Sequence, residues 1–269
     1  MGIFDFLRSS QPSSNVLPQN CLLNYKRLNS IFQSSSQKYR EAEPFPHIVI
    51  DDFLDKDIAE LVMKEFPSID STIWSARDAK SHLGLDAQKL KWDYSLGRKY
   101  LDYEMSLHPV IRYLLLEINS NTFLRGLRTL TGIPGLISDP KMEGGGLHQT
   151  KKGGMLRIHA DFQKHPNYQL DRRLNFLLFL NPHWENKWHG ELELWPSDMK
   201  EKAVSILPIA NRCVIFTTSR HSYHGYTQPL ECPDSITRQS MAMYYYTVPN
   251  LDGTRKQSET YWQELPGEA

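Results

Sequence analysis

Short β-rich runs separated by turn residues fill the second half of the chain, and they limit its fold more than any other feature. From Gly144 onward the runs recur about every 8 to 12 residues, with Gly, Pro and Asn between them. This spacing predicts an antiparallel sandwich or jelly roll. The predicted strands are Met155–Phe162, Leu174–Leu180, Glu191–Trp195, Ala203–Ile206, Arg212–Thr217 and Ser240–Val248.

The start of the chain predicts a loosely ordered lead, a strand and a helix. Residues 9–20 and 33–40 are rich in Ser, Gln, Asn and Pro, and only a short helical piece is expected between them. Order begins with the strand-like run at residues 45–54. A helix should then start from Asp55, a residue that suits an N-cap, and end at Pro67.

A second helical block precedes the β-rich half. Pro109 suits a first helical turn, Ser120 or Asn121 should begin a further helix, and Gly132 should close it. The expected fold class is therefore α+β, with an N-terminal helical lead packed on a β core. In residue ranges, we expect a loosely ordered lead at 1–43 and a single domain at 44–269, which is helical over 44–143 and β-rich over 144–250.

The composition fits one large globular domain and argues against nucleic acid and membranes as general partners. The 269 residues are 40% apolar and 23% charged, and 31 Lys and Arg balance 31 Asp and Glu. A net charge of zero argues against a general electrostatic grip on nucleic acid or on an anionic membrane. No run reaches the roughly 18 apolar residues of a membrane span, and the N-terminus does not look like a signal peptide.

The cysteines point to a reducing compartment. Cys21, Cys213 and Cys232 are odd in number and lie far apart, without a C-x-x-C pair. This pattern predicts neither a disulfide framework nor a cysteine-based zinc site. We therefore expect a cytoplasmic protein.

A His-x-Asp motif lies on one predicted strand. Residues two apart on a strand share a face, so His159 and Asp161 should project side by side. With a distant histidine, for which His224 is the best candidate, they would form a 2-His-1-carboxylate triad that suits iron(II). A surface histidine beside a solvated aspartate is the usual alternative for the motif alone, and zinc is the main competitor as the metal.

An arginine and a serine follow the distal histidine on the last predicted strand. Arg238 and Ser240 are two residues apart, so strand geometry places both on one face. An open iron site needs an electron source to activate O₂, and a 2-oxo acid that chelates iron leaves a far carboxylate. A guanidinium fork with a neighbouring hydroxyl suits that carboxylate, although a surface ion pair is the common role for a lone arginine.

Together these residues resemble the iron(II)/2-oxoglutarate-dependent oxygenases, specifically the bacterial branch similar to prolyl 4-hydroxylase catalytic domains. The resemblance covers about residues 44 to 248. The matching runs are Pro44–His47, Phe53–Leu54, Gly144–Gln149, Gly153–Phe162, Asp171–Asn181, Gly190–Trp195, Ser222–Gly225 and Arg238–Tyr246. The ordered set is specific, whereas no single run is.

The resemblance implies a double-stranded β-helix with His159, Asp161 and His224 as iron ligands. It assigns Arg238 and Ser240 to the C5 carboxylate of 2-oxoglutarate. The implied cofactors are Fe(II), 2-oxoglutarate and O₂, with ascorbate as a candidate reductant. Two features depart from the branch: prolyl 4-hydroxylases often have lysine in place of Arg238, and a Gly-Gly pair usually stands where this chain has His189-Gly190.

Other residues near the motif are candidates for the pocket. Asn175 could touch 2-oxoglutarate or a metal ligand, and Phe179 on the same strand face could form an apolar wall. His148 and Gln149 are substrate candidates, with plain structure as the alternative. Arg172 could meet an anionic substrate or lie on a solvated strand edge.

The expected function is an Fe(II)- and 2-oxoglutarate-dependent dioxygenase that hydroxylates an unactivated C–H bond of a small molecule, such as an amino acid or a biosynthetic intermediate, and releases succinate and CO₂. One alternative is a peptidyl, prolyl-type hydroxylase. Others are a non-catalytic jelly-roll binding module and a zinc hydrolase. The sequence does not determine the substrate, the carbon attacked or the oligomeric state.

Overall fold

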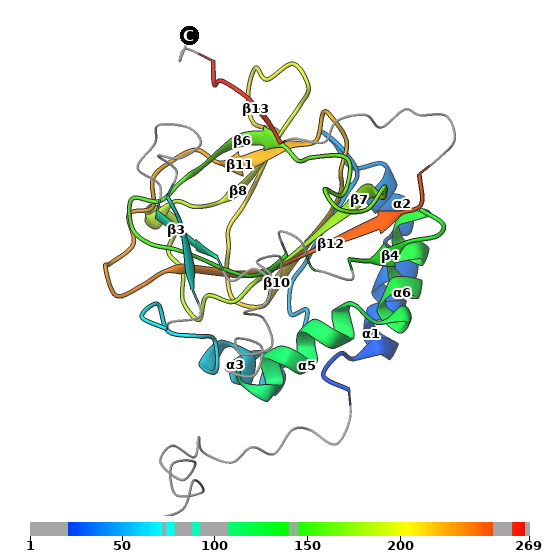
Figure 1. Ribbon diagram of the computed structural model, residues 1–269, viewed down its shortest axis with the longest axis horizontal. Coiled ribbons are helices and arrows are strands. Elements are labelled where there is room, and N and C mark those ends of the chain that lie inside the picture. The colour runs from blue at the N-terminus through cyan, green and yellow to red at the C-terminus, as the bar shows by residue number, and fades with distance from the viewer. Residues whose placement is uncertain are drawn as a thin grey trace, which may run out of the picture.

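Two antiparallel sheets face each other in the computed structural model, and helices lie along the outside of the larger sheet (Figure 1). The structure describes residues 21–71, 74–78, 88–91, 107–139, 142, 145–249 and 260–266. Two facing sheets of this kind form a double-stranded β-helix, or jelly roll, as expected. The prediction of an α+β chain with a jelly-roll core is confirmed.

The larger sheet has the strand order β1-β10-β7-β12-β5-β3-β2, with β4 beside β12. These strands are β1 (His47–Ile50), β2 (Ser75–Asp78), β3 (Gln88–Lys91), β4 (Ile137–Ser138), β5 (Gly146–Thr150), β7 (Asp171–Phe179), β10 (Arg212–Thr217) and β12 (Arg238–Thr247). The two longest, β7 and β12, pair along most of their length and form its centre.

The smaller sheet has the order β13-β6-β11-β8-β9 and is built from short strands. They are β6 (Leu156–Ala160), β8 (Leu192–Trp195), β9 (Val204–Ile206), β11 (Tyr223–Tyr226) and β13 (Tyr261–Trp262). A 3₁₀ turn, η4 (Asn186–Trp188), precedes β8. The predicted strands agree with the observed ones to within a few residues, and Arg212–Thr217 matches at both ends.

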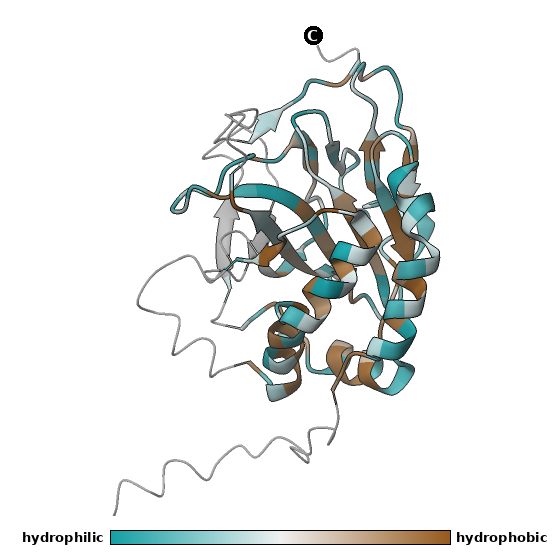
Figure 2. Ribbon diagram, turned by 90° about the vertical axis from the view of Figure 1, so that its right-hand side faces the viewer, coloured by the Kyte–Doolittle hydropathy of each residue, from teal (hydrophilic) through white to brown (hydrophobic). Residues whose placement is uncertain are grey.

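Among the described residues, five α-helices cover the outer face of the larger sheet. They are α1 (Tyr25–Ser34), α2 (Ser36–Arg40), α3 (Lys56–Lys64), α5 (Pro109–Ile118) and α6 (Asn121–Thr131). Alternate residues of the central strands, among them Phe176 and Tyr245, enter one apolar cluster with Phe123 and Leu127 of α6. Figure 2 shows helices that carry both polar and apolar residues, as such a one-sided contact requires.

The helix ends lie where the sequence predicts them. Ser120 caps α6 by accepting a hydrogen bond from the Phe123 backbone N–H at 3.2 Å, and Gly132 ends it with a φ of 73°. Pro109 is the first residue of α5. Asp55 does occupy the N-cap position of α3, but its carboxylate accepts from Asn24 Nδ2 at 3.2 Å instead of capping the helix.

The prediction that residues 33–40 are loosely ordered is wrong. They complete α1 and form α2, and both Phe32 and Tyr39 are 1% exposed. The Tyr39 hydroxyl lies 2.7 Å from Thr217 Oγ1 on β10. The Ser- and Gln-rich composition therefore marks the solvent-facing side of two docked helices. Residues 9–20, which carry the rest of that prediction, lie outside the described residues.

Within the described ranges, no helix has both the length and the apolar character needed to cross a bilayer.

Candidate metal centre

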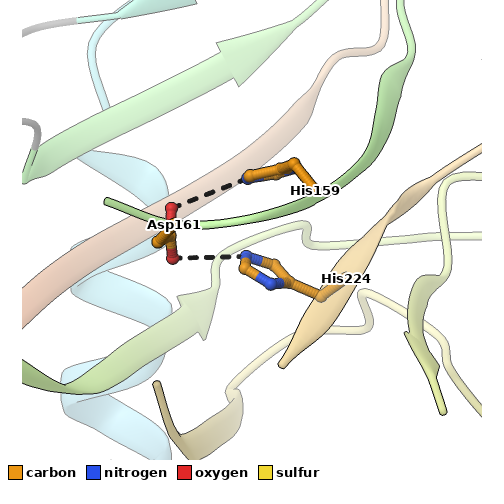
Figure 3. Close-up of side chains that lie close together, drawn as sticks. All are labelled: His159, Asp161 and His224. Atoms are coloured by element: carbon orange, nitrogen blue, oxygen red, sulfur yellow. Dashed lines mark ion pairs between the residues drawn. The ribbon is translucent and has the colours of Figure 1, made fainter. Parts of the chain in front are cut away.

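Two histidines and an aspartate converge beside the paired strands β6 and β11. His159 lies near the end of β6, Asp161 follows that strand, and His224 lies on β11 directly opposite His159 in the strand register. One ligand atom from each residue lies within 4.8 Å of the other two (Figure 3). All three residues are buried, with exposed fractions of 8% or less. The predicted triad is therefore brought together.

The glycine after His224 allows this convergence. A Cβ atom on Gly225 would lie 2.5 Å from the Leu156 carbonyl oxygen and 2.7 Å from that of Arg157. Backbone this close leaves no room for a side chain. The register between β11 and β6 also shifts between His224 and Tyr226. The Ser-Tyr-His-Gly motif thus has a steric reason for its last residue.

Hydrogen bonds orient both imidazoles toward the carboxylate. His159 Nδ1 lies 2.9 Å from the Arg157 carbonyl oxygen, and His224 Nδ1 lies 2.9 Å from that of Ser222. Because a carbonyl only accepts, Nδ1 donates in each ring, and the lone pair of the neutral ring lies on Nε2. These Nε2 atoms face Asp161 Oδ1 at 3.6 Å and Oδ2 at 3.5 Å.

The protonation states suit a cation. Burial, followed by the neighbouring His159, lowers the pKa of His224 to about 4, so its ring is neutral near pH 7. Burial alone would raise the pKa of Asp161, but the Arg172 guanidinium and the two imidazoles together hold it well below its usual range. Two nitrogen lone pairs and a carboxylate therefore face one point. This donor set fits a divalent transition metal, with iron(II) as the typical occupant of such a triad.

A pocket beside the triad is lined by the inner faces of three strands of the larger sheet. The register places Asn175 opposite Tyr244 and Phe179 opposite Ser240, and these four side chains all line the pocket. Its other lining residues are His148, Thr150, Leu156, His159, Asp161, Leu177, Leu192, His224, Tyr226 and Arg238. Of the predicted cofactor residues, Asn175, Phe179, Arg238 and Ser240 are all brought to this pocket.

Arg238 is held at the pocket by its Nε atom. That atom donates to the Gly190 carbonyl oxygen at 2.7 Å, and the guanidinium carbon lies 4.5 Å from the ring centre of Tyr226 and 4.9 Å from that of Phe179. Among the described residues, no acceptor bonds its two terminal nitrogens. Burial lowers the pKa of Arg238, yet its donors stay available for an anion.

The loop at His189-Gly190, where the chain departs from the family pattern, still allows close contact with Arg238. Gly190 has a φ of 80°, and a Cβ atom there would lie 2.5 Å from Leu230 and 3.2 Å from the Arg238 side chain. His189 adopts a φ of 58° without being glycine, a conformation that costs a non-glycine residue strain. The departure at His189 therefore leaves the Gly190–Arg238 contact in place.

Of the three candidate substrate residues, one lines the pocket and two do not. Arg172 is not on a solvated edge: it is 1% exposed and bonds Asp161, and it is not among the pocket-lining residues. Gln149 is fully buried and absent from the pocket lining, since neighbouring residues on β5 face opposite sides. His148, one position earlier, does line the pocket.

Two other described histidines, His221 and His165, are not part of the metal-ligating cluster. His221 is exposed in the turn before β11, which supports the choice of His224. The His165 side chain is fully buried, with Nε2 3.2 Å from Asp139 Oδ1. Backbone N–H groups of Asn167 and Tyr168 point at its Nδ1, so it anchors the loop after the motif.

Trp262 was missed by sequence reasoning. Its ring centre lies 4.8 Å from that of His159, and strand β13 places it opposite His159 at the edge of the smaller sheet. A single tryptophan near the C-terminus carries no motif. The aromatic pair Tyr261-Trp262 is compatible with a strand, but the sequence does not reveal which strand it pairs with.

A family model decides the classification. Residues 145–246 match the model described as the 2OG-Fe(II) oxygenase superfamily. This segment belongs to that superfamily. Its cofactors are iron(II) and 2-oxoglutarate, in agreement with the donor set of the triad. No curated protein matches the chain.

The chain is also similar to solved structures. A prolyl 4-hydroxylase of Phytophthora capsici is 20% identical with a TM-score of 0.55, over 86% of this chain and 68% of that one. A Trichoplax adhaerens prolyl hydroxylase, solved with a hypoxia inducible factor peptide, is 17% identical with a TM-score of 0.48, over 82% and 90%. HygX from Streptomyces hygroscopicus, solved with nickel, 2-oxoglutarate and hygromycin B, is 12% identical with a TM-score of 0.45, over 81% and 93%. The first of these supports the fold alone.

Proposed function

We propose that the protein is an Fe(II)- and 2-oxoglutarate-dependent dioxygenase that hydroxylates an unactivated C–H bond of a small molecule. The observation that carries this proposal is the combination of a buried His159–Asp161–His224 triad and a buried Arg238 on one pocket. A zinc hydrolase would have no use for a buried guanidinium with two available donors. A binding module would have no use for three metal ligands with matched tautomers.

Each part of the pocket has a separate task. His159, Asp161 and His224 would hold the metal through two Nε2 atoms and a carboxylate oxygen. Arg238, supported by the Ser240 hydroxyl, holds the C5 carboxylate of 2-oxoglutarate through charge-assisted hydrogen bonds. Leu177, Phe179 and Leu192 make the wall apolar, which keeps water away and strengthens the ionic contact.

When bound, iron(II) and 2-oxoglutarate supply the oxidising chemistry: one atom of O₂ enters the substrate as hydroxyl and the other enters succinate, with loss of CO₂. The chain contributes orientation. The two histidines and the aspartate would supply three ligands to a metal, and a triad of this kind leaves other metal positions open for a cofactor. Asp161 provides a fixed anionic ligand, which favours hydroxylation over chemistry that needs another anion at that position.

Metal analysis combined with a turnover assay tests the proposal. The purified protein should bind iron(II) at the triad and convert 2-oxoglutarate to succinate, and a substrate should gain one oxygen atom in its mass spectrum. The proposal would be refuted if the purified protein contains zinc and forms no succinate, whether or not candidate substrates are added. Arg238→Lys serves as a matched variant, because it keeps the charge but loses the planar fork.

The same assay addresses the substrate class. Free amino acids and small biosynthetic intermediates form one panel, and proline-containing peptides form the other. We propose the small-molecule class, and oxygen transfer to a peptide alone would replace it with peptidyl hydroxylation. A cytoplasmic location is also part of the proposal, and it is supported by three cysteines that are all free.

A further inference from the structure

Arg172 is among the largest fully buried side chains of the described residues, and its guanidinium forms an ion pair with the Asp161 carboxylate. Only 1% of its surface is exposed, whereas arginine is almost never fully buried unless it is paired. Its Nη2 atom donates to Asp161 Oδ2 at 2.9 Å. The next residue, Arg173, is only partly buried and instead lies 3.3 Å from Thr247 Oγ1. Two adjacent arginines therefore have different environments.

Asn175 closes a three-membered network with this pair. Arg172 donates to Asn175 Oδ1 from Nη2 at 2.8 Å and from Nε at 3.1 Å. Asn175 Nδ2 then donates to Asp161 Oδ2 at 2.7 Å. The amide orientation is fixed, because its oxygen can only accept from the guanidinium and its nitrogen can only donate to the carboxylate. One carboxylate oxygen thus receives two short hydrogen bonds.

Aromatic rings prevent the guanidinium from leaving. Its central carbon lies 4.5 Å from the ring centre of Phe162 and 3.6 Å from that of Tyr244. Contacts of a cation with ring faces are favourable, and the rings also exclude water from the Arg172–Asp161 pair. The side chain can therefore act on Asp161 with a fixed geometry.

We propose that Arg172 and Asn175 are positioning residues that hold Asp161 Oδ2 as a preorganised anion and leave Oδ1 as the donor for the metal. This proposal rests on the proposed metal-dependent function. A carboxylate with one oxygen engaged by two donors is biased against binding a metal through both oxygens. A metal position is then kept for other ligands. The buried carboxylate also keeps a counter-charge before a metal binds, which offsets the cost of burying it alone.

Cobalt(II) binding, measured without 2-oxoglutarate or turnover, tests the proposal directly. Partners that orient metal ligands typically change metal affinity about 10- to 100-fold when they are removed. We therefore expect Asn175→Ala to weaken cobalt(II) binding about tenfold in calorimetry, and Arg172→Lys to weaken it at least as much. Arg173→Ala is the matched control and should leave the affinity unchanged.

The visible spectrum of bound cobalt(II) separates positioning from mere structural support. Absorption of cobalt(II) falls as its coordination number rises. If Asp161 is released, it can chelate with both oxygens, so the bands of Asn175→Ala should be weaker than those of the unaltered protein at saturating metal. A variant that merely loosened the fold would lower the unfolding temperature without changing the saturated spectrum.

The outcomes are distinct. Affinity within twofold of the unaltered protein and an unchanged spectrum in both Asn175→Ala and Arg172→Lys would overturn the positioning role alone. Weaker binding with an unchanged saturated spectrum would also overturn it, in favour of general structural support. Failure of the unaltered protein to bind cobalt(II) or iron(II) would overturn the proposed function together with this inference.

Discussion

The larger and smaller sheets contribute to the site in opposite ways. The larger sheet is packed against the described helices on its outer face. It provides Arg172 and Asn175, which donate to Asp161, and Arg238 and Ser240, which line the pocket. The smaller sheet has strands of two to five residues and only small apolar clusters, yet both histidine ligands come from it. Asp161 follows the smaller sheet but is fixed by residues of the larger one.

Because of this difference, the residues that stabilise the fold are largely separate from the residues proposed to bind the metal. Most of the apolar core, including the Phe53–Phe123–Phe176 contacts, lies between the helices and the larger sheet. Removing a ligand from the smaller sheet removes little of that core. We therefore expect ligand variants to lose function while remaining folded, and core variants to lose stability while retaining the site in the molecules that stay folded.

The largest effect should follow removal of a histidine ligand. His159→Ala or His224→Ala takes one of three donors from the metal, so iron(II) binding and turnover should both fall below detection. Metal titration and succinate formation measure this, and circular dichroism should show a folded protein. His221→Ala, three residues from His224 and exposed, is the control and should be fully active. Full activity in either ligand variant would show that the triad is not the metal site.

The next largest effect should be on stability. Phe176 is fully buried, with ring centres 5.4 Å from Phe53 and 5.7 Å from Phe123. Phe176→Ala should lower the free energy of unfolding by about 3–5 kcal/mol, measured by denaturant titration. Leu116→Ala on α5, where the leucine is 67% exposed, should change it by about 0.5 kcal/mol or less. Equal losses in both would contradict a core concentrated on the helix-covered face.

A more selective effect is expected for Arg238→Ala. The guanidinium provides charge-assisted hydrogen bonds, and their loss typically costs about 1.5–3 kcal/mol. Since about 1.4 kcal/mol corresponds to a tenfold change, the half-saturating concentration of 2-oxoglutarate should rise about 10- to 100-fold. Iron affinity should stay nearly constant, because Arg238 comes from the larger sheet and is not a metal ligand. An unchanged 2-oxoglutarate requirement would remove Arg238 from the cofactor site.

The sequence predicts the parts of the site that depend on strand alternation and on ordered motifs. His159 and Asp161 share a run, and Arg238 and Ser240 share another, so period-two geometry places each pair on one face. The caps of α6 are equally local. The structure brings each pair to the pocket and caps α6 as expected, because each feature depends on neighbours in the chain. The binding roles of the pocket residues stay predictions.

The parts that the sequence does not reveal depend on long-range contacts. Two adjacent arginines look alike in the sequence, and only the packing of Phe162 and Tyr244 shows that Arg172 is the buried one. His165 looks solvated until Asp139 is placed beside it. Trp262 meets His159 across a gap of more than a hundred residues, which no periodicity can express.

The smallest predicted effect concerns Trp262 and asks whether β13 belongs to the working part of the smaller sheet. Its ring centre lies 4.8 Å from that of His159, so a paramagnetic metal at the triad should quench its emission. Trp262→Phe should remove most of the metal-dependent quenching but keep an aromatic ring on His159. Trp262→Leu should also remove an aromatic contact that contributes about 0.5–1.5 kcal/mol, and so weaken metal binding a few-fold.

Quenching that persists in both variants would place the responsive tryptophan elsewhere. Equal metal affinity in the two variants would show that β13 only covers His159. Weaker binding in Trp262→Leu alone would show that this edge strand supports His159 as a ligand, a support that Asp161 receives from the larger sheet.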